Sequence, residues 1–173
     1  MRERTIIVNG VSKAYAMTGW RIGFIAAPEW IVKGCNKLQG QYTSGPCSVS
    51  QKAAEAAYTT SQECVETMRK AFERRRDLIV ELAKDIPGLE VNKPEGAFYL
   101  FPKCSSFFGK SYNGKKIENS TDLAMFLLEV GHVATVGGDA FGDPYCFRMS
   151  YATSDDNIRE AMKRIKDTLA LLA

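Results

Sequence analysis

The stretch "NGVSKAYAMTGWRIG", residues 9–23, decides which structure and chemistry we predict for the N-terminal part of this 173-residue chain. It places Lys13 just after an apolar run and a glycine turn, and Arg21 follows eight residues later. A lysine becomes a nucleophile only when loss of solvent or a nearby cation disfavours its ammonium form. A buried strand end could remove solvent from Lys13, and Arg21 could supply the cation. The stretch is therefore either a solvated turn between two strands or a reactive lysine turn.

The chemistry open to a reactive lysine at this position is narrow. Its amine can form a Schiff base with an aldehyde or a ketone. If the aldehyde carried a phosphate, Arg21 could bind it, because a guanidinium fork matches phosphate oxygens. Gly10, Gly19 and Gly23 would let the backbone approach such a ligand closely. The residues alone leave both interpretations of the turn open.

Length and composition are those of an ordinary globular protein, with 45% hydrophobic and 25% charged residues. The length predicts one domain, or one and a part. Lysine and arginine outnumber the acids 23 to 20, and a net charge of +3 is too small to indicate nucleic acid or a membrane as partner. No apolar run reaches membrane-spanning length, and "MRERTIIV" is too short and charged for a signal peptide. We therefore expect a cytoplasmic protein.

Several standard sites are not expected. The five cysteines are odd in number and far apart, and no CxxC pair occurs, which predicts buried or half-buried thiols rather than disulfides or a zinc site. His132 is the only histidine, so a histidine metal cluster is excluded, and its place after a helix end indicates a structural role. "GKS" at 109–111 lacks the earlier glycine of a phosphate-binding loop, and "ERRRD" at 73–77 is typical of a solvated helix face.

Strand and helix signals alternate along the chain. The segments 5–8 and 21–27 are apolar nearly throughout, which predicts two strands buried on both faces of a sheet. Shorter strands are expected at 89–91, 97–101, 133–136 and 145–151, and an exposed loop at 103–119. Helices are expected over 29–41, from 48 onward, over 61–86, from Ser120 or Thr121 to Gly131, and from an N-cap at Ser154.

The last of these helices is the most clearly signalled. Asp155 and Asp156 suit the positive end of the helix dipole. Its apolar positions recur at helical spacing and predict one buried stripe, made of Ile158, Met162, Ile165, Leu169 and Leu172. Residues 61–173 therefore predict a compact α+β unit, whereas residues 1–60 do not contain enough sheet to stand alone.

Residues 10–23, "GVSKAYAMTGWRIG", resemble the lysine signature of class I aminotransferases, the pyridoxal-phosphate enzymes of fold type I. Three further segments resemble the same family in the same order: "KLQGQYTSGPCSVSQKAA" (37–54), "PEGAFYLFP" (94–102) and "GGDAFGDPYCFRMSYATS" (137–154). The resemblance covers nearly the whole chain from Thr5 onward and is closest to the bacterial-type aspartate aminotransferase branch. It implies an α/β fold, with the end of the large-domain sheet in 1–60 and the small α+β C-terminal domain in 61–173.

The resemblance also implies roles for particular residues. Lys13 would form the Schiff base with pyridoxal 5'-phosphate and then move a proton between the substrate α-carbon and the cofactor. Arg21 would bind the cofactor phosphate, with Ser12 as a nearby hydroxyl, because Gly10 stands where many members have a phosphate-binding serine. Arg148 would bind the substrate α-carboxylate through a bidentate pair. No metal is implied.

Partners and substrates follow from the same resemblance. The segment Tyr42, Thr43 and Ser44 resembles a loop that lies at the subunit interface and approaches the neighbour's active site, which predicts a homodimer. An ordinary turn is the alternative for this loop. The expected reaction moves an amino group between an α-amino acid, with aspartate as the family-level expectation, and a 2-oxo acid.

Members of this family are more than twice as long as this chain, which resembles their C-terminal half. We therefore expect a fragment with little or no transaminase activity alone, without the phosphate turn, the stacking aromatic and the aspartate of the other half. Two alternatives stay open at this point. One is a pyridoxal-phosphate lyase on the same scaffold, and the other is a non-enzymatic ligand-binding module, such as the sensing part of a transcription regulator.

Overall fold

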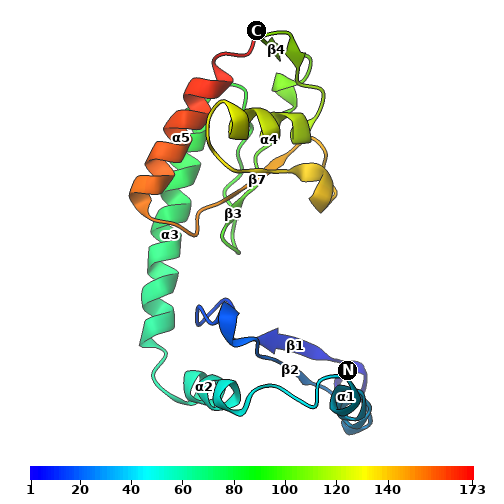
Figure 1. Ribbon diagram of the computed structural model, residues 1–173. Helices are drawn as coiled ribbons and strands as arrows, with labels where there is room; N and C mark the ends of the chain where they lie inside the picture. Colours follow the sequence, from blue (N-terminus) through cyan, green and yellow to red (C-terminus); the bar gives the residue numbers. More distant parts are fainter. The chain divides into compact units, whose positions relative to one another are not determined.

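The computed structural model describes all 173 residues, which divide into two units, Met1–Met68 and Arg69–Ala173. Figure 1 shows the elements of each unit in the colours of the sequence. Helix α3 (Glu63–Lys84) begins in the first unit and continues into the second. Each unit has its own cluster of buried residues.

The first unit is built on a two-stranded antiparallel sheet. Its register places Ile7 opposite Ala26 and Gly10 opposite Gly23. A long turn joins the strands, and two helices follow them. The elements are η1 (Arg2–Arg4), β1 (Ile7–Gly10), η2 (Thr18–Trp20), β2 (Gly23–Ala26), α1 (Glu29–Tyr42) and α2 (Ser48–Thr59), where η denotes a 3₁₀ helix.

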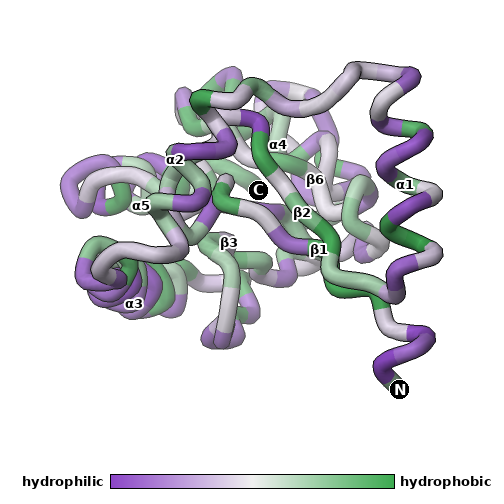
Figure 2. Tube along the Cα trace, turned by 90° about the horizontal axis from the view of Figure 1, so that it is seen from below, coloured by the Kyte–Doolittle hydropathy of each residue, from purple (hydrophilic) through white to green (hydrophobic).

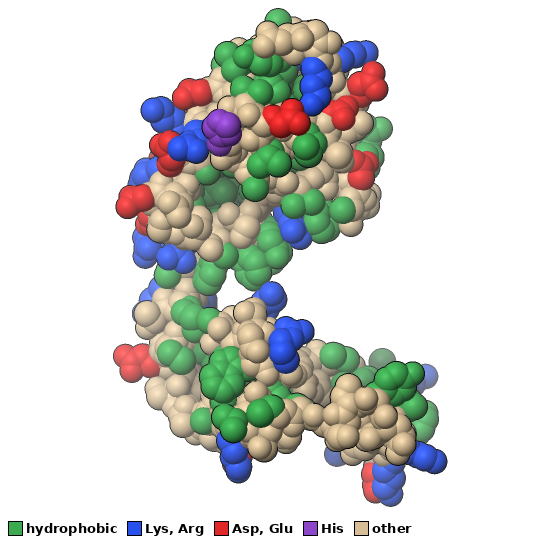
Figure 3. Space-filling view, viewed as in Figure 1, with side chains coloured by type: hydrophobic (Ala, Val, Ile, Leu, Met, Phe, Trp, Pro, Cys, Tyr) green, Lys and Arg blue, Asp and Glu red, His purple; other side chains and the backbone are tan.

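The expectation that both strands are buried on both faces is wrong for this structure. Ile7 is 55% exposed and Val8 is 75% exposed, although both are strongly apolar. The physical reason is that Ile7 and Val8 project from opposite faces of a small two-stranded sheet, and neither face is fully covered there by another element. Helix α1 has no buried residue, and in Figure 2 it alternates between hydrophobic and hydrophilic positions. Figure 3 shows hydrophobic side chains reaching the surface of each unit.

The second unit contains a three-stranded antiparallel sheet in the order β3-β7-β6. Helix α4 contacts β6 and β7, and helices α3 and α5 lie side by side (Figure 1). Arg74 of α3 joins α5 through a two-pronged pair with Asp155, at 2.9 and 3.1 Å. The elements are β3 (Tyr99–Leu100), η3 (Ser105–Phe107), β4 (Ser111–Tyr112), β5 (Lys115–Lys116), α4 (Ser120–Glu129), β6 (Val136–Gly137), η4 (Gly138–Phe141), β7 (Phe147–Ser150) and α5 (Asp155–Leu169).

The core of the second unit forms where β7 meets α3, α4 and α5. Phe147 and Met149 of β7 are buried, and so is Tyr151 just after the strand. The predicted stripe of α5 is confirmed, because every one of its members is buried: Ile158, Met162, Ile165, Leu169 and Leu172. The N-cap at Ser154 is also confirmed, since its Oγ accepts a hydrogen bond from the Asn157 amide at 3.2 Å.

The start of α4 differs from the expectation. Its N-cap is Asn119, whose Oδ1 accepts from the Asp122 amide at 2.9 Å, and neither Ser120 nor Thr121 caps it. Ser120 is fully buried instead, and its hydroxyl accepts from the Gly138 amide at 3.0 Å. An asparagine and a serine are equally good caps in isolation, so the choice depends on this second contact.

Two further expectations about strands and loops are corrected. The segment 103–119 is not an exposed loop, because it contains the β4–β5 hairpin and buries Phe107 and Ile117. The apolar residues within this polar stretch anchor it to the core. The expected strand at 89–91 is reduced to a single bridge between Glu90 and Lys103.

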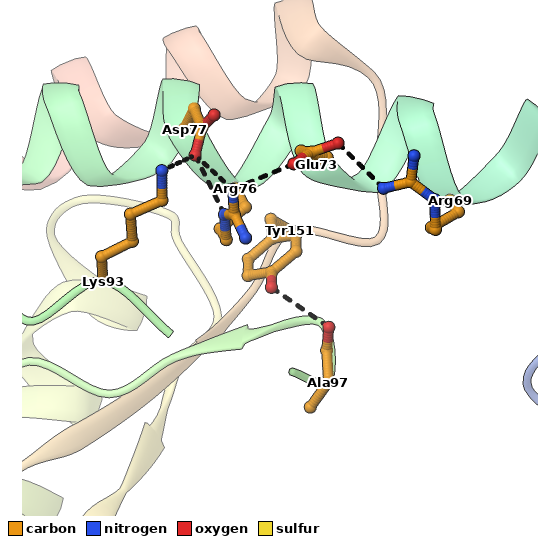
Figure 4. A network of polar contacts seen from close by, with 7 residues as sticks. All are labelled: Arg69, Glu73, Arg76, Asp77, Lys93, Ala97 and Tyr151. Carbon is orange, nitrogen blue, oxygen red and sulfur yellow. Dashed lines mark hydrogen bonds and ion pairs between the residues drawn. The ribbon is translucent and has the colours of Figure 1, made fainter. Parts of the chain in front are cut away.

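The basic stretch 73–77 is more than a solvated helix face. Arg76 is 18% exposed and pairs with Asp77 at 2.9 Å and with Glu73 at 3.6 Å. Lys93 joins Asp77 at 2.8 Å, as Figure 4 shows. Hydrogen bonds from Lys93 and Arg76 lower the pKa of the Asp77 carboxyl. This network therefore ties α3 to the segment that leads into β3.

The cysteines divide into two groups. Cys35, Cys47 and Cys64 are exposed, which corrects the expectation of buried or half-buried thiols for these three, whereas Cys104 and Cys146 are buried. Burial raises the pKa of the Cys104 thiol to about 12 and that of Cys146 to about 11. No disulfide links any of them.

Three remaining observations concern function classes. No helix of this structure has both the length and the apolar character that crossing a membrane requires. No cluster of three or more histidine, cysteine or acidic side chains could hold a metal ion. His132 is exposed and adopts a left-handed backbone conformation, with φ of +54°, just after the C-cap of α4.

We predict that Leu123→Ala destabilises the second unit by about 2–5 kcal/mol, because Leu123 is fully buried in the core. The matched control is Leu128→Ala on the same helix, at a position that is 45% exposed. Urea unfolding followed by far-UV circular dichroism measures the difference. Equal unfolding midpoints for the two variants would contradict the assignment of the core.

We predict that the raised pKa of Cys104 makes stability fall at alkaline pH. The folded state holds the thiol proton more tightly than the unfolded state does. This contribution is therefore present below the ordinary pKa near 9 and is lost as the pH rises toward 12. Urea midpoints measured between about pH 8 and about pH 11 should fall more steeply for the parent chain than for Cys104→Ala. Cys64→Ala, at an exposed thiol, should follow the parent chain.

Candidate functional site

The turn between β1 and β2 surrounds a hollow of about 500 Å³ at the surface of the first unit. Three of the residues singled out from the sequence, Ser12, Lys13 and Arg21, line this one hollow together. The full lining is Asn9, Gly10, Ser12, Lys13, Ala14, Arg21, Ile22 and Gly23. The structure therefore brings the lysine and the arginine of the signature to the same place.

The turn is held at its two ends by a small core. Val11 is fully buried at the start of the turn and Ile22 is buried at its end, and both pack with Ala54 of α2. Between them the chain folds tightly, with the Ala16 amide donating to the Lys13 carbonyl at 3.2 Å. Lys13 thus lies on a turn whose ends are fixed while its own side chain is exposed.

Arg21 has a strained backbone. Its φ of 54° and ψ of 48° are left-handed, a conformation that costs an L-residue about 1–2 kcal/mol. The Arg21 guanidinium donates to the Thr18 carbonyl at 2.9 Å and makes no ion pair within the chain. The surrounding turn holds this conformation, and backbone strain of this kind is typical of functional sites.

Gly10 is required by a close approach between the two strands. A Cβ added at Gly10 would lie 2.9 Å from the Ile22 carbonyl oxygen and 3.2 Å from the Gly23 Cα. This contact gives a physical reason for glycine at the position where the resemblance suggested a serine. The neighbouring Asn9 lines the hollow, and its Oδ1 accepts from the Gly10 amide at 2.8 Å. Sequence reasoning treated Asn9 only as a turn residue.

Aromatic side chains join the turn to α2. The rings of Tyr15 and Tyr58 meet edge to face with centroids 5.2 Å apart, and Phe24 meets Tyr58 at 5.6 Å. The Tyr15 hydroxyl donates to Gln62 Oε1 at 2.8 Å. Sequence reasoning missed these residues, because nothing in the local pattern shows that residues 15 and 58 meet.

The expected cause of lysine activation is not present in this structure. Sequence analysis placed Lys13 at a buried strand end, where loss of solvent would destabilise its ammonium form. Lys13 is exposed, because the strands beside it are themselves exposed. The strands of its own unit therefore do not desolvate the Lys13 amine.

Arg148 lies in the second unit, on β7, opposite Val136 of β6. It is half-buried, and its guanidinium makes no ion pair or hydrogen bond with any other side chain. Two aromatic rings, those of Tyr99 and Phe141, lie against it. An unpaired, half-buried guanidinium is a suitable partner for a carboxylate ligand.

The loop residues Tyr42, Thr43 and Ser44 are all exposed. Tyr42 ends α1, and the Thr43 amide donates to the Gln39 carbonyl at 3.0 Å, which closes the last turn. Ser44 has a φ of 62°. This arrangement satisfies a helix end and leaves all three side chains accessible.

Taken together, the hollow offers an exposed amine, a guanidinium and a hydroxyl within a volume typical of small-ligand sites. The amine can bond covalently to a carbonyl, and the guanidinium can bind a phosphate or carboxylate. This donor set fits a small phosphorylated aldehyde, and it includes no metal ligand cluster.

The chain is similar to one family of known proteins over nearly its whole length. The family model described as aminotransferase class I and II matches residues 1–165. The bifunctional aspartate aminotransferase and glutamate/aspartate-prephenate aminotransferase of Petunia hybrida is 48% identical over 176 residues, covering 99% of this chain and 37% of the relative. The aspartate aminotransferase of Rhizobium meliloti is 48% identical over 166 residues, covering 95% of this chain and 40% of the relative.

Solved structures give the same result. The crystal structure of the Rhizobium meliloti aspartate aminotransferase matches with a TM-score of 0.95 and 46% identity, covering 99% of this chain and 43% of that one. The aromatic aminotransferase of Pyrococcus horikoshii matches with a TM-score of 0.88 and 40% identity, covering 98% and 44%. The fold is therefore mixed α/β and corresponds to part of the fold type I architecture. The chain spans about two fifths of the length of the curated relatives it matches.

We predict that Gly10→Ala destabilises the first unit by about 1–3 kcal/mol, because the new methyl group would press on the Ile22 carbonyl. Gly19→Ala is the matched control, since nothing lies within 4 Å of a Cβ added there. Both tryptophans, Trp20 and Trp30, belong to the first unit, so tryptophan fluorescence during urea unfolding reports on that unit. Equal midpoints for the two variants would show that the close approach is unimportant.

Proposed function

The chain belongs to the class I and II aminotransferase family, and on that premise we propose that it carries the lysine turn and the substrate arginine of an aminotransferase. The reaction moves an amino group between an α-amino acid and a 2-oxo acid, with pyridoxal 5'-phosphate as cofactor. The observation that carries this proposal is the single hollow lined by Ser12, Lys13 and Arg21.

The residues of the hollow fit this cofactor. Lys13 supplies the amine that bonds to its aldehyde, and Arg21 supplies a guanidinium for its phosphate. Ser12 adds a hydroxyl, and Gly10 and Gly23 let the backbone approach without side chains in the way. When bound, pyridoxal phosphate supplies an electron sink for the electron pair left on the substrate α-carbon.

Lys13 has two tasks in this proposal. Its amine would hold the cofactor covalently, since its exposed side chain on a tight turn can reach a ligand by a flexible four-carbon stem. With the cofactor bound, Lys13 Nζ would take a proton from the substrate α-carbon and deliver it to the cofactor.

Arg148 binds the substrate α-carboxylate in this proposal. Its guanidinium is half-buried and has no anionic partner in the chain, so a substrate carboxylate would be its first ion pair. The relatives include aspartate, prephenate and aromatic aminotransferases. We propose aspartate as the amino acid, because aspartate aminotransferases are among the relatives in both comparisons, at 48% and 46% identity.

Residues outside these 173 are needed for efficient reaction in this proposal. The lining of the hollow contains no aromatic ring and no carboxylate, so nothing in it could stack on a pyridine ring or pair with the ring nitrogen. We assign residues 1–60 to the end of a large cofactor-binding domain and 61–173 to a small C-terminal domain. The exposed segment 42–44 would approach the site of a second subunit in a homodimer. The 173 residues alone should have little or no transaminase activity.

Covalent trapping tests this proposal. The 173-residue chain is incubated with pyridoxal phosphate and reduced with borohydride, and the modified lysine is mapped by peptide mass spectrometry. We expect label concentrated on Lys13 and lost in Lys13→Ala, whereas Lys33→Ala, at another exposed lysine of the first unit, keeps it. Arg21→Lys should weaken labelling about tenfold, because charge-assisted hydrogen bonds of a guanidinium contribute about 1.5–3 kcal/mol.

Unselective labelling would contradict the proposal. Label spread over many lysines, with the same pattern in Lys13→Ala, would mean that the turn has no selectivity for the cofactor. Pyridoxal, which lacks the phosphate, is the second reagent. If it labels Lys13 as selectively as pyridoxal phosphate does, the proposed role of Arg21 is wrong, while that of Lys13 stands.

A further inference from the structure

We propose that Tyr99 and Phe141 form an aromatic clamp that positions the Arg148 guanidinium for a planar carboxylate. The inference rests on the proposed function, in which Arg148 binds the substrate, and it names two positioning residues for that site. The clamp fixes which edge of the guanidinium the ligand meets.

The Arg148 guanidinium lies against two aromatic rings. The Arg148 Cζ lies 4.3 Å from the centroid of Tyr99 and 4.2 Å from that of Phe141. Both distances are well inside the roughly 6 Å within which a cation is attracted to a ring face. Tyr99 belongs to β3 and Phe141 to η4, so the two rings reach the guanidinium from different elements of the unit.

Tyr99 is fixed by the sheet and by the residues next to it. It lies on β3 opposite Ser150, two residues along β7 from Arg148. The Tyr151 hydroxyl donates to the Ala97 carbonyl at 3.1 Å, as Figure 4 shows, and the Tyr151 amide donates to the Phe98 carbonyl at 3.0 Å. The segment that precedes Tyr99 is therefore tied to the segment that follows Arg148.

Phe141 is fixed by a turn that only glycine can form. A Cβ added at Gly138, the first residue of η4, would lie 2.1 Å from the Asp143 carbonyl oxygen and 2.3 Å from that of Cys146. The turn that carries Phe141 therefore lies directly against the start of β7. Phe101 packs on Phe141 edge to face, with centroids 6.1 Å apart, which holds the ring from its outer side.

The two rings restrict the direction from which a ligand can approach the Arg148 guanidinium. They limit the access of water and ligands to the guanidinium where they lie against it, and its N–H donors point outward in the guanidinium plane. A planar carboxylate meets such an edge with two parallel hydrogen bonds, whereas an untethered arginine would lose rotamer freedom on binding. The clamp removes part of that cost before the ligand arrives, and it uses no acidic residue that would compete with the ligand.

The experiment uses the 173-residue chain without cofactor and 2-oxoglutarate as the probe. The Arg148 Nε–Hε resonance is assigned by its loss in Arg148→Lys, and titration with the probe gives a dissociation constant. Ring currents should shift the Hε resonance upfield in the parent chain. Tyr99→Leu and Phe141→Leu should each reduce that shift and weaken binding about three- to tenfold, a change equivalent to the usual strength of one cation–π contact.

Conservative variants show whether the two rings position Arg148 or only support the fold of the unit. Tyr99→Phe and Phe141→Tyr keep a ring and should keep both the upfield shift and the affinity. Tyr145→Leu is the matched control, because Tyr145 is a 56% exposed aromatic residue of the same unit whose ring does not touch Arg148. The amide spectra of all variants report whether the fold is retained.

Each outcome decides a different point. Leucine variants that bind the probe as tightly as the parent would overturn the clamp and leave the role of Arg148 intact. A parent chain whose Arg148 resonance does not respond to the probe would overturn the carboxylate role and the clamp together. Covalent trapping tests Lys13, which lies in the first unit, so its result does not depend on either of these outcomes in the second unit.

Discussion

The alternation of side chains along β7 is the constraint on which the second unit depends. Phe147 and Met149 point into the core, while Arg148 between them faces the opposite side of the sheet. A shift of one residue would exchange these faces, burying an unpaired cation and exposing two large apolar side chains. The register is fixed from both sides, by Leu100 opposite Met149 and Val136 opposite Arg148. The position of the guanidinium is therefore a consequence of core packing.

The first unit depends on a different kind of contact. Its buried core consists of Val11, Ile22 and Ala54, far fewer residues than the core of the second unit. The conformation of the turn between β1 and β2 is held instead by backbone contacts. These are the close approach of Gly10 to the Ile22 carbonyl and the left-handed conformation of Arg21. A small core limits the hydrophobic contribution to stability, so this unit relies on backbone geometry that only particular residues tolerate.

Local patterns in the sequence predicted local structure well. The Ser154 cap and the buried stripe of α5 follow from helical periodicity and from capping chemistry within one turn, and both are present. The resemblance at residues 10–23 also identified residues that share one hollow. The features that were missed depend on distant partners: Asn119 caps α4 while the Ser120 hydroxyl accepts from the Gly138 amide, and Tyr99 and Phe141 both meet Arg148 only through the fold. Periodicity contains no information about such pairings.

The contrast between the units bears on how a ligand would act on each site. Arg148 lies on the central strand over a large core, so its surroundings are stable before any ligand binds. The lysine turn carries two non-glycine residues with positive φ, Ala16 and Arg21, at a cost of about 1–2 kcal/mol each, with few buried contacts to offset it. A ligand that binds only the ordered turn stabilises it by mass action. On the proposed function, the cofactor therefore serves the lysine turn as a structural element as well as a reagent, whereas the carboxylate site needs no such support.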